Sequence, residues 1–175
     1  LTLHITHHTS HVTRHTSHII YHTSHIMKDL VEWTEDLSVG IEEIDEQHKV
    51  LVGLVNRLYH GIIHQSSTAL LQEVLNELVQ YTVVHFAVEE SLMRIFDYPL
   101  YKEHKHAHQE LAKQVIDLQM KFKAGKATIS MELLTFLRKW LTNHIMGDDK
   151  KYTPYFLERG VKKSWTKRSW MGKIW

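Results

Sequence analysis

Residues 71–96, LQEVLNELVQYTVVHFAVEESLMRIF, repeat apolar side chains at intervals of three and four and therefore predict one long amphipathic helix. The same apolar stripe contains His85 and Glu89, which are four residues apart and so lie one turn apart on one helical face. A single pair of this kind is weak support for a site. The pair indicates a site only if other segments place further ligand residues in the same interior.

Three more segments have a helical period, at about residues 45–65, 97–125 and 130–147. Helices joined by short loops pack as antiparallel neighbours. Residues 27–44 lack this period but contain Trp33 and several aliphatic residues, which suggests an extended arm packed across the helices. The predicted fold is all-α, an up-down-up-down antiparallel four-helix bundle with an N-terminal arm and a short basic and aromatic C-terminal helix or tail.

The two ends of the chain differ in composition from the predicted bundle, which we place at residues 27–157. Residues 1–26 contain eight of the sixteen histidines in a seven-residue repeat, so we expect a disordered extension, with a metal-collecting tract as the alternative. Residues 158–175 combine basic residues with three tryptophans. This mixture suits contact with a membrane surface or a membrane enzyme, and the alternative is a solvated tail that covers the bundle end.

Composition narrows the classes of function. The chain has no cysteine, which excludes disulfides, thiolate ligands and a cysteine nucleophile, so nitrogen and oxygen atoms must hold any metal. It has no apolar run long enough to cross a bilayer and no secretory signal, so we expect a cytoplasmic protein. The net charge of +1 argues against a general polyanion binder. We expect a monomer with no nucleic-acid partner.

Each predicted helix places histidine on its apolar face, and a bundle would bring these faces to a common interior. The fragments are His48, His85 with Glu89, His104 with His108, and His144 with an acid just beyond it. By helical angle, His60, His64 and His106 lie well away from these faces, so we expect them to face solvent.

Counting ligands indicates which metal these fragments could hold. Five histidine nitrogens and two bridging carboxylates make about nine bonds, too many for one four-coordinate zinc. Two six-coordinate ions with one bridging solvent oxygen would use this set and keep about one position open for a small ligand. An imidazole-rich set with few carboxylates suits iron, whereas zinc, copper and nickel are less natural and magnesium and calcium are disfavoured. The sequence therefore predicts two iron ions.

The order and spacing of these fragments resemble the bacteriohemerythrins, the single-domain bacterial members of the hemerythrin family. The matching strings are GIEEIDEQH at 40–48, His85-Phe86 through Glu89-Glu90 to Met93, His104 through His108, and His144-Ile145 through Asp149 to Tyr152. The resemblance implies a non-heme di-iron centre with an oxo or hydroxo bridge. It assigns His104, His108 and His144 to one iron and His48 and His85 to the other, with Glu89 and one aspartate bridging the two.

Two aspartates compete for the second bridging position. Asp148 is four residues from His144 and shares its face in an ideal helix, whereas Asp149 is rotated by about 140°. The family pattern favours Asp149. The two arguments agree if the helix ends or loosens at Gly147, so we predict Asp149 as the ligand.

The resemblance also implies reversible binding of O2, for transport, storage or delivery, by a carrier and not an enzyme. Five apolar residues match the family's oxygen pocket, with ordinary bundle core as the alternative: Leu51, Phe86, Trp140, Leu141 and Ile145. Tyr152 matches a tyrosine near the bridging aspartate and is expected to orient it. The alternative functions are a di-iron oxidase, a scavenger of peroxide or nitric oxide, and an oxygen or iron sensor.

Overall fold

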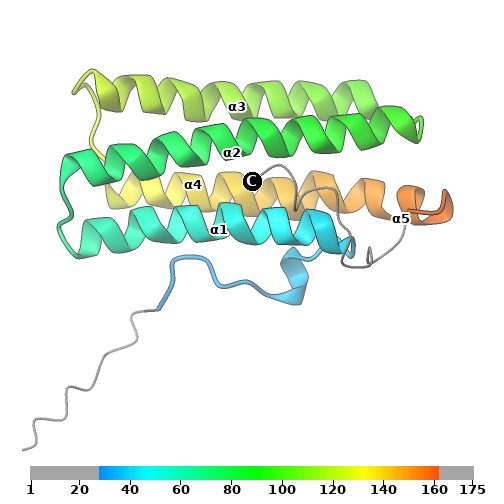
Figure 1. Ribbon diagram of the computed structural model, residues 1–175, viewed down its shortest axis with the longest axis horizontal. Helices are drawn as coiled ribbons and strands as arrows, with labels where there is room; N and C mark the ends of the chain where they lie inside the picture. Colours follow the sequence, from blue (N-terminus) through cyan, green and yellow to red (C-terminus); the bar gives the residue numbers. More distant parts are fainter. Residues whose placement is uncertain (1–27, 162–175) are drawn as a thin grey trace, which may run out of the picture.

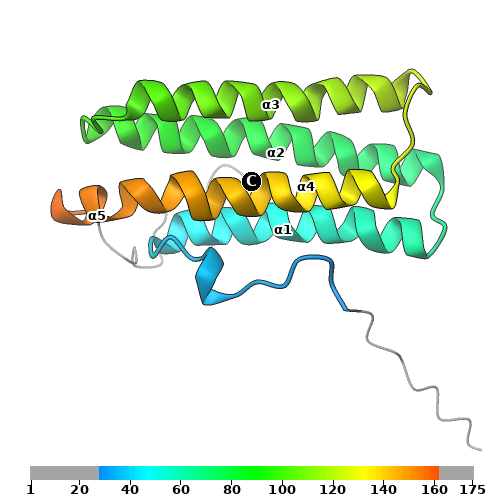
Figure 2. The same cartoon turned by 180° about the vertical axis from the view of Figure 1, so that it is seen from behind.

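The computed structural model describes residues 28–161, and all regular structure in this range is helical. Four antiparallel helices lie side by side, namely α1 (Glu42–Ile63), α2 (Thr68–Ile95), α3 (Tyr101–Lys123) and α4 (Met131–His144) (Figure 1). Helix α2 packs against α1 and α3, and α1 also packs against α4 (Figure 2). The predicted four-helix bundle is confirmed.

The helices form where the apolar stripes predict them, because each stripe is buried in one shared core. Leu58, Leu75, Leu78, Leu134 and Leu137 are fully buried between the helices. Side-chain caps fix two of the helix starts, as Ser67 Oγ accepts the Leu70 amide at 3.3 Å and Ser130 Oγ accepts the Leu133 amide at 3.3 Å.

A side chain of α1 holds the start of the arm that precedes this helix. Asn56 of α1 accepts the backbone N–H of Val31 and donates to its carbonyl, both at 2.9 Å. Val31, Leu37 and Val39 are buried, and the arm runs along α1 with only the short 3-10 turn η1 (Glu35–Leu37) (Figure 1). The predicted arm is present and packed, but it lies along α1 and does not cross the bundle.

Helix α1 begins at Glu42, three residues before the predicted start at Asp45. The Asp45 carboxylate does not mark the helix end, because it reaches back to the arm. It accepts Ser38 Oγ at 2.6 Å and the Val39 amide at 2.7 Å. Asp45 therefore lies within α1, and its side chain anchors the loop in front of the helix.

The helix predicted to end at Gly147 continues beyond it. Helix α4 passes into a π-helical turn, η2 (Ile145–Asp149), and then into α5 (Lys150–Glu158), which prolongs α4 at the end of the bundle (Figure 2). In η2 the Lys150 N–H donates to the carbonyl of Ile145, five residues earlier. The sequence argument correctly located the irregularity at Gly147, although the chain loosens there and does not stop.

The predictions for residues 1–26, and for nearly all of the tail at 158–175, fall outside the described residues. Among the helices that the structure describes, none is both long enough and apolar enough to cross a membrane.

Candidate metal centre

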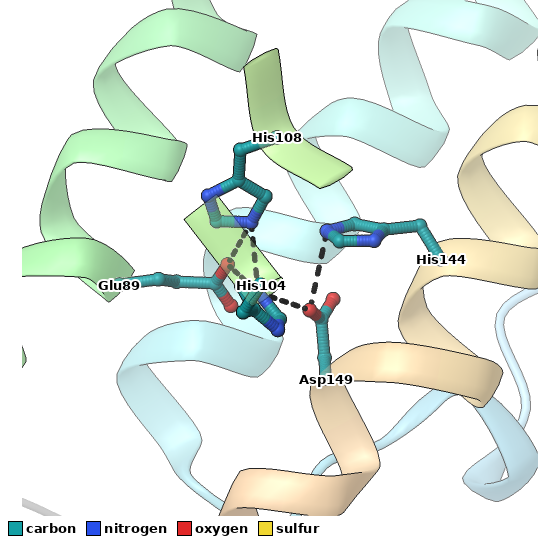
Figure 3. Close-up of side chains that lie close together, drawn as sticks. All are labelled: Glu89, His104, His108, His144 and Asp149. Atoms are coloured by element: carbon teal, nitrogen blue, oxygen red, sulfur yellow. Dashed lines mark hydrogen bonds and ion pairs between the residues drawn. The ribbon is translucent and has the colours of Figure 1, made fainter. Parts of the chain in front are cut away.

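Seven ionisable side chains meet in the interior of the bundle, where each is at most 6% exposed. They are the predicted ligands His48, His85, Glu89, His104, His108, His144 and Asp149. Five of them point toward one another in Figure 3. Burial of so many polar groups is unfavourable unless something satisfies them, which marks this cluster as a site.

The cluster divides into two groups whose ligand atoms lie within 4.8 Å of one another. The first contains Glu89, His104, His108, His144 and Asp149, and the second contains His48, His85, Glu89 and Asp149. Both groups include the same two carboxylates. The side chains are therefore arranged as two adjacent cation sites with Glu89 and Asp149 between them.

Asp149 presents a different oxygen to each group. Its Oδ1 lies 3.3 Å from His104 Nε2 and 3.2 Å from His144 Nε2, whereas its Oδ2 lies 3.4 Å from His48 Nε2. Glu89 also reaches both sides, with Oε2 at 3.1 Å from His108 Nε2 and Oε1 at 3.9 Å from His48 Nε2. Asp149 can thus contribute one oxygen to each cation, whereas Glu89 Oε2 faces both groups, because it also lies 3.7 Å from His85 Nε2.

Several atoms that face the centre have no hydrogen-bond partner among residues 28–161, although they are completely buried. These are Nε2 of His48 and His144, Oε2 of Glu89 and both carboxylate oxygens of Asp149. Buried polar atoms without partners are rare because they lose their hydration without compensation. Cations placed between them would satisfy both nitrogen and oxygen donors, and an imidazole and carboxylate set of this kind fits iron.

The π turn brings Asp149 to the centre. An aspartate five residues after His144 would be turned away in a regular α-helix, but residues five apart nearly align in a π turn. Asp149 is 0% exposed, whereas Asp148 lies at the rim with a side chain that is 39% exposed. The structure thus places Asp149, and not Asp148, between the two groups.

Three of the imidazoles use their outward nitrogen for a partner outside the centre. His85 Nδ1 lies 2.9 Å from Gln47 Oε1, His108 Nδ1 lies 3.3 Å from Glu90 Oε1, and His144 Nδ1 lies 3.4 Å from Asp148 Oδ2. A proton donated from Nδ1 leaves the Nε2 lone pair free to face the centre. None of these three contacts was predicted from the sequence, where Gln47 and Glu90 only neighbour predicted ligands and Asp148 was considered as a bridging ligand.

The surroundings shift the titration of these groups in opposite directions. Burial lowers the pKa of His85 to about 4, so this imidazole is neutral near pH 7. Burial also acts to lower the pKa of His104, but the Asp149 and Glu89 carboxylates that face its Nε2 raise that pKa to about 9. Without a metal ion, His104 therefore takes a proton that a cation would displace.

Tyr152 differs from its sequence-based expectation. Its buried hydroxyl donates to Glu89 Oε1, so the expected partner, Asp149, is wrong. Burial and the nearby Glu89 charge raise the pKa of Tyr152 well above its ordinary value, so the hydroxyl keeps its proton. The error arose because sequence proximity to Asp149 says little about which carboxylate a tyrosine in α5 reaches.

The apolar residues predicted to lie around the centre are part of the hydrophobic core. The residues predicted for an oxygen pocket, Leu51, Phe86, Trp140, Leu141 and Ile145, are all buried. Phe86 stacks on His108, with 3.8 Å between ring centroids and 7° between ring planes. Trp140 Nε1 donates to the Leu111 carbonyl at 3.3 Å, which fixes the indole between α3 and α4.

The histidines that were expected outside the centre do lie outside it. His64 and His106 are exposed, and His60 is partly exposed at the C-terminal end of α1. His60 contacts Asp29 of the arm, at 2.7 Å between Nε2 and Oδ1.

Comparisons with known proteins agree with this geometry. The family model of the hemerythrin HHE cation binding domain matches residues 39–156. A bacteriohemerythrin of Stenotrophomonas maltophilia is 42% identical over 123 residues, covering 70% of this chain and 79% of that protein. A bacteriohemerythrin of Methylococcus capsulatus is 35% identical over 126 residues, covering 71% and 95%. A crystal structure of wild-type hemerythrin matches with a TM-score of 0.68 at 34% identity, covering 73% of this chain and 98% of that one.

Proposed function

The chain belongs to the hemerythrin family, and from this premise we propose that it binds dioxygen reversibly at a centre of two iron ions. We infer that one ion is held by His104, His108 and His144, the other by His48 and His85, and that Glu89 and Asp149 bridge them. The observation that carries the proposal is the Asp149 carboxylate, whose two oxygens face the two histidine groups separately.

The two ions would differ in their protein ligands. The group with His104 offers three imidazoles and the group with His48 offers two, while both share the same carboxylates. The ion with fewer protein ligands would be the one at which a small molecule could bind. A pair of ferrous ions would supply the electrons that dioxygen takes up when it binds.

The contribution of the chain itself is to keep this centre dry and fixed. Phe86 covers His108 by stacking, and Leu51 and Ile145 are 1% and 0% exposed. Such walls exclude water, which would otherwise promote irreversible oxidation and the escape of a charged product. Tyr152 holds Glu89 through its hydroxyl, so the carboxylate keeps its orientation.

The residue set favours holding oxygen over activating it. Di-iron enzymes built on helical bundles use a glutamate from each of two helices and two Glu-x-x-His motifs, which makes a carboxylate-rich site. The cluster here has five histidines and two carboxylates. Mixing the reduced protein with O2 in a stopped-flow spectrophotometer tests the proposal. A visible absorption change that reverses under vacuum supports a carrier, and steady O2 consumption with product release contradicts it.

A further inference from the structure

A second pair of histidines with helical spacing lies outside the proposed iron centre. His60 and His64 are four residues apart near the C-terminal end of α1, and their rings stack at 6.4 Å between centroids with 25° between planes. Asp29 of the arm lies against the first of them, at 2.7 Å between His60 Nε2 and Asp29 Oδ1. The arm thus brings a carboxylate to a helical face that already presents two imidazoles.

The space around this pair is open. A hollow of about 280 Å³ lies between the end of α1 and the start of α2, and His60, His64 and Arg57 line it. The side chain of His60 is 30% exposed and that of Asp29 is 52% exposed, so solvent ions reach both. The Arg57 guanidinium would repel a cation, but its charge is paired with Glu77 at 2.6 Å between Nη1 and Oε2.

We propose that His60, His64 and Asp29 hold a divalent transition-metal ion of the zinc class at this surface, with solvent completing its coordination. Two histidines at i and i+4 with an acidic third ligand make a recurring zinc set. Imidazole nitrogens favour zinc, copper and nickel over magnesium and calcium. The site does not depend on the identity of the metal in the buried centre.

Binding requires two adjustments, and the larger is a turn of the exposed His64 ring toward His60, because the two ring centroids stand 6.4 Å apart and the three ligand atoms do not yet lie within 4.8 Å of one another. Ligands of a tetrahedral zinc ion with bonds of about 2.0 Å stand about 3.3 Å apart, so the 2.7 Å contact between His60 and Asp29 must widen by roughly half an ångström. Exposed side chains can make this change by rotation. The bound ion would connect α1 to the arm close to the Val31–Asn56 contact, and would therefore bind the folded chain in preference to the unfolded one.

The test uses the full, iron-loaded protein with Zn²⁺ as the probe. The eight histidines of residues 1–26 can also take up zinc, so total uptake does not distinguish the sites. The thermal midpoint does when the variants are compared, because only zinc bound more tightly to the folded chain than to the unfolded one raises it, and the variants leave residues 1–26 unchanged. The variants are His60→Gln, His64→Gln and Asp29→Asn, with His106→Gln as a matched surface control on α3.

We expect zinc to raise the midpoint of the wild type and of His106→Gln equally. His60→Gln and His64→Gln should lower the zinc affinity measured from this shift by about tenfold or more, and Asp29→Asn by less. Each substitution can also lower the midpoint by breaking the His60–Asp29 contact. Comparing the midpoints with and without zinc in the same variant removes this effect. Equal zinc shifts in His60→Gln, His64→Gln and the wild type would overturn the proposal, as would a shift that occurs only with loss of iron.

Discussion

The part of the chain that the structure describes contains two His-x-x-x-His pairs, one within α3 and one at the C-terminal end of α1, and they have very different surroundings. His104 and His108 of α3 are buried, and their Nε2 atoms lie 2.9 Å apart beside Glu89 and Asp149. His60 and His64 of α1 lie at the surface, and within the described residues only Asp29 adds a carboxylate contact to them. Identical spacing thus produces a closed centre in one place and an open face in the other.

This difference shows what sequence spacing can and cannot decide. Spacing of four residues places two imidazoles on one side of a helix. A binding centre also requires other elements to converge on that side, and His104 and His108 meet side chains from α2, α4 and η2. We expect the buried pair to hold its metal firmly and the exposed pair to exchange it readily.

The largest effect is expected from Glu89→Gln. Glu89 belongs to both groups of ligands, and an amide cannot bridge two cations as a carboxylate does. Iron measured after purification should fall from about two per chain to well below one. His64→Gln, which alters the exposed pair, is the matched control and should keep the full iron content. Iron retention in Glu89→Gln, or iron loss in the control, would remove the distinction between the two pairs.

A smaller but sharper test compares Asp149→Asn with Asp148→Asn. Asp149 faces both groups, whereas Asp148 only contacts the outward nitrogen of His144. Asp149→Asn should lose most of the iron. Asp148→Asn should bind iron with an affinity weaker by about 10- to 100-fold at most, as is usual for partners behind a metal ligand. Competition with a chelator measures both, and a reversed order of the two variants would refute the assignment.

The pH dependence of the metal-free protein sharpens the comparison further. The pKa of His104 is raised to about 9 in the folded chain, above its ordinary value of 6.5. Its pairing with the carboxylates therefore stabilises the fold fully below pH 6.5, and this contribution is lost as the pH rises through about 9.

The free energy of unfolding should accordingly fall by roughly 3 kcal/mol over this range. Urea titrations of chelator-treated protein between pH 6 and 10 measure the slope. His104→Gln should flatten it, and His64→Gln should leave it unchanged. A slope of the same size in His104→Gln would show that another group causes it.

The smallest effect is expected from Tyr152→Phe. The change removes one buried hydroxyl that donates to Glu89, so we expect a loss of about 1–3 kcal/mol in the free energy of unfolding. Iron should remain at about two per chain, because the ligands are intact. Chemical denaturation together with iron analysis checks both values. Complete loss of iron would mean that Tyr152 does more than orient Glu89.

The sequence could predict the bundle because each helix has a long apolar stripe, and helical angles separated His48 from His60 and His64. The ends of helices and the irregular turns were harder to predict from the sequence. Asp45 resembled a helix start while anchoring the arm, and only the three-dimensional path of η2 shows how Asp149 turns inward. Gln47 contacts His85 and Tyr152 contacts Glu89, which are 38 and 63 residues away in the sequence. Local periodicity cannot predict contacts over such separations.

One measurement tests the central claim most directly. Iron content is determined on the purified full chain, and the optical spectrum of the same sample is followed through cycles of reduction, addition of O2 and removal of O2. We predict about two irons per chain and a visible absorption band that appears with O2 and disappears without it. One iron or fewer per chain, or a band that never reverses, would contradict the proposed two-iron oxygen carrier.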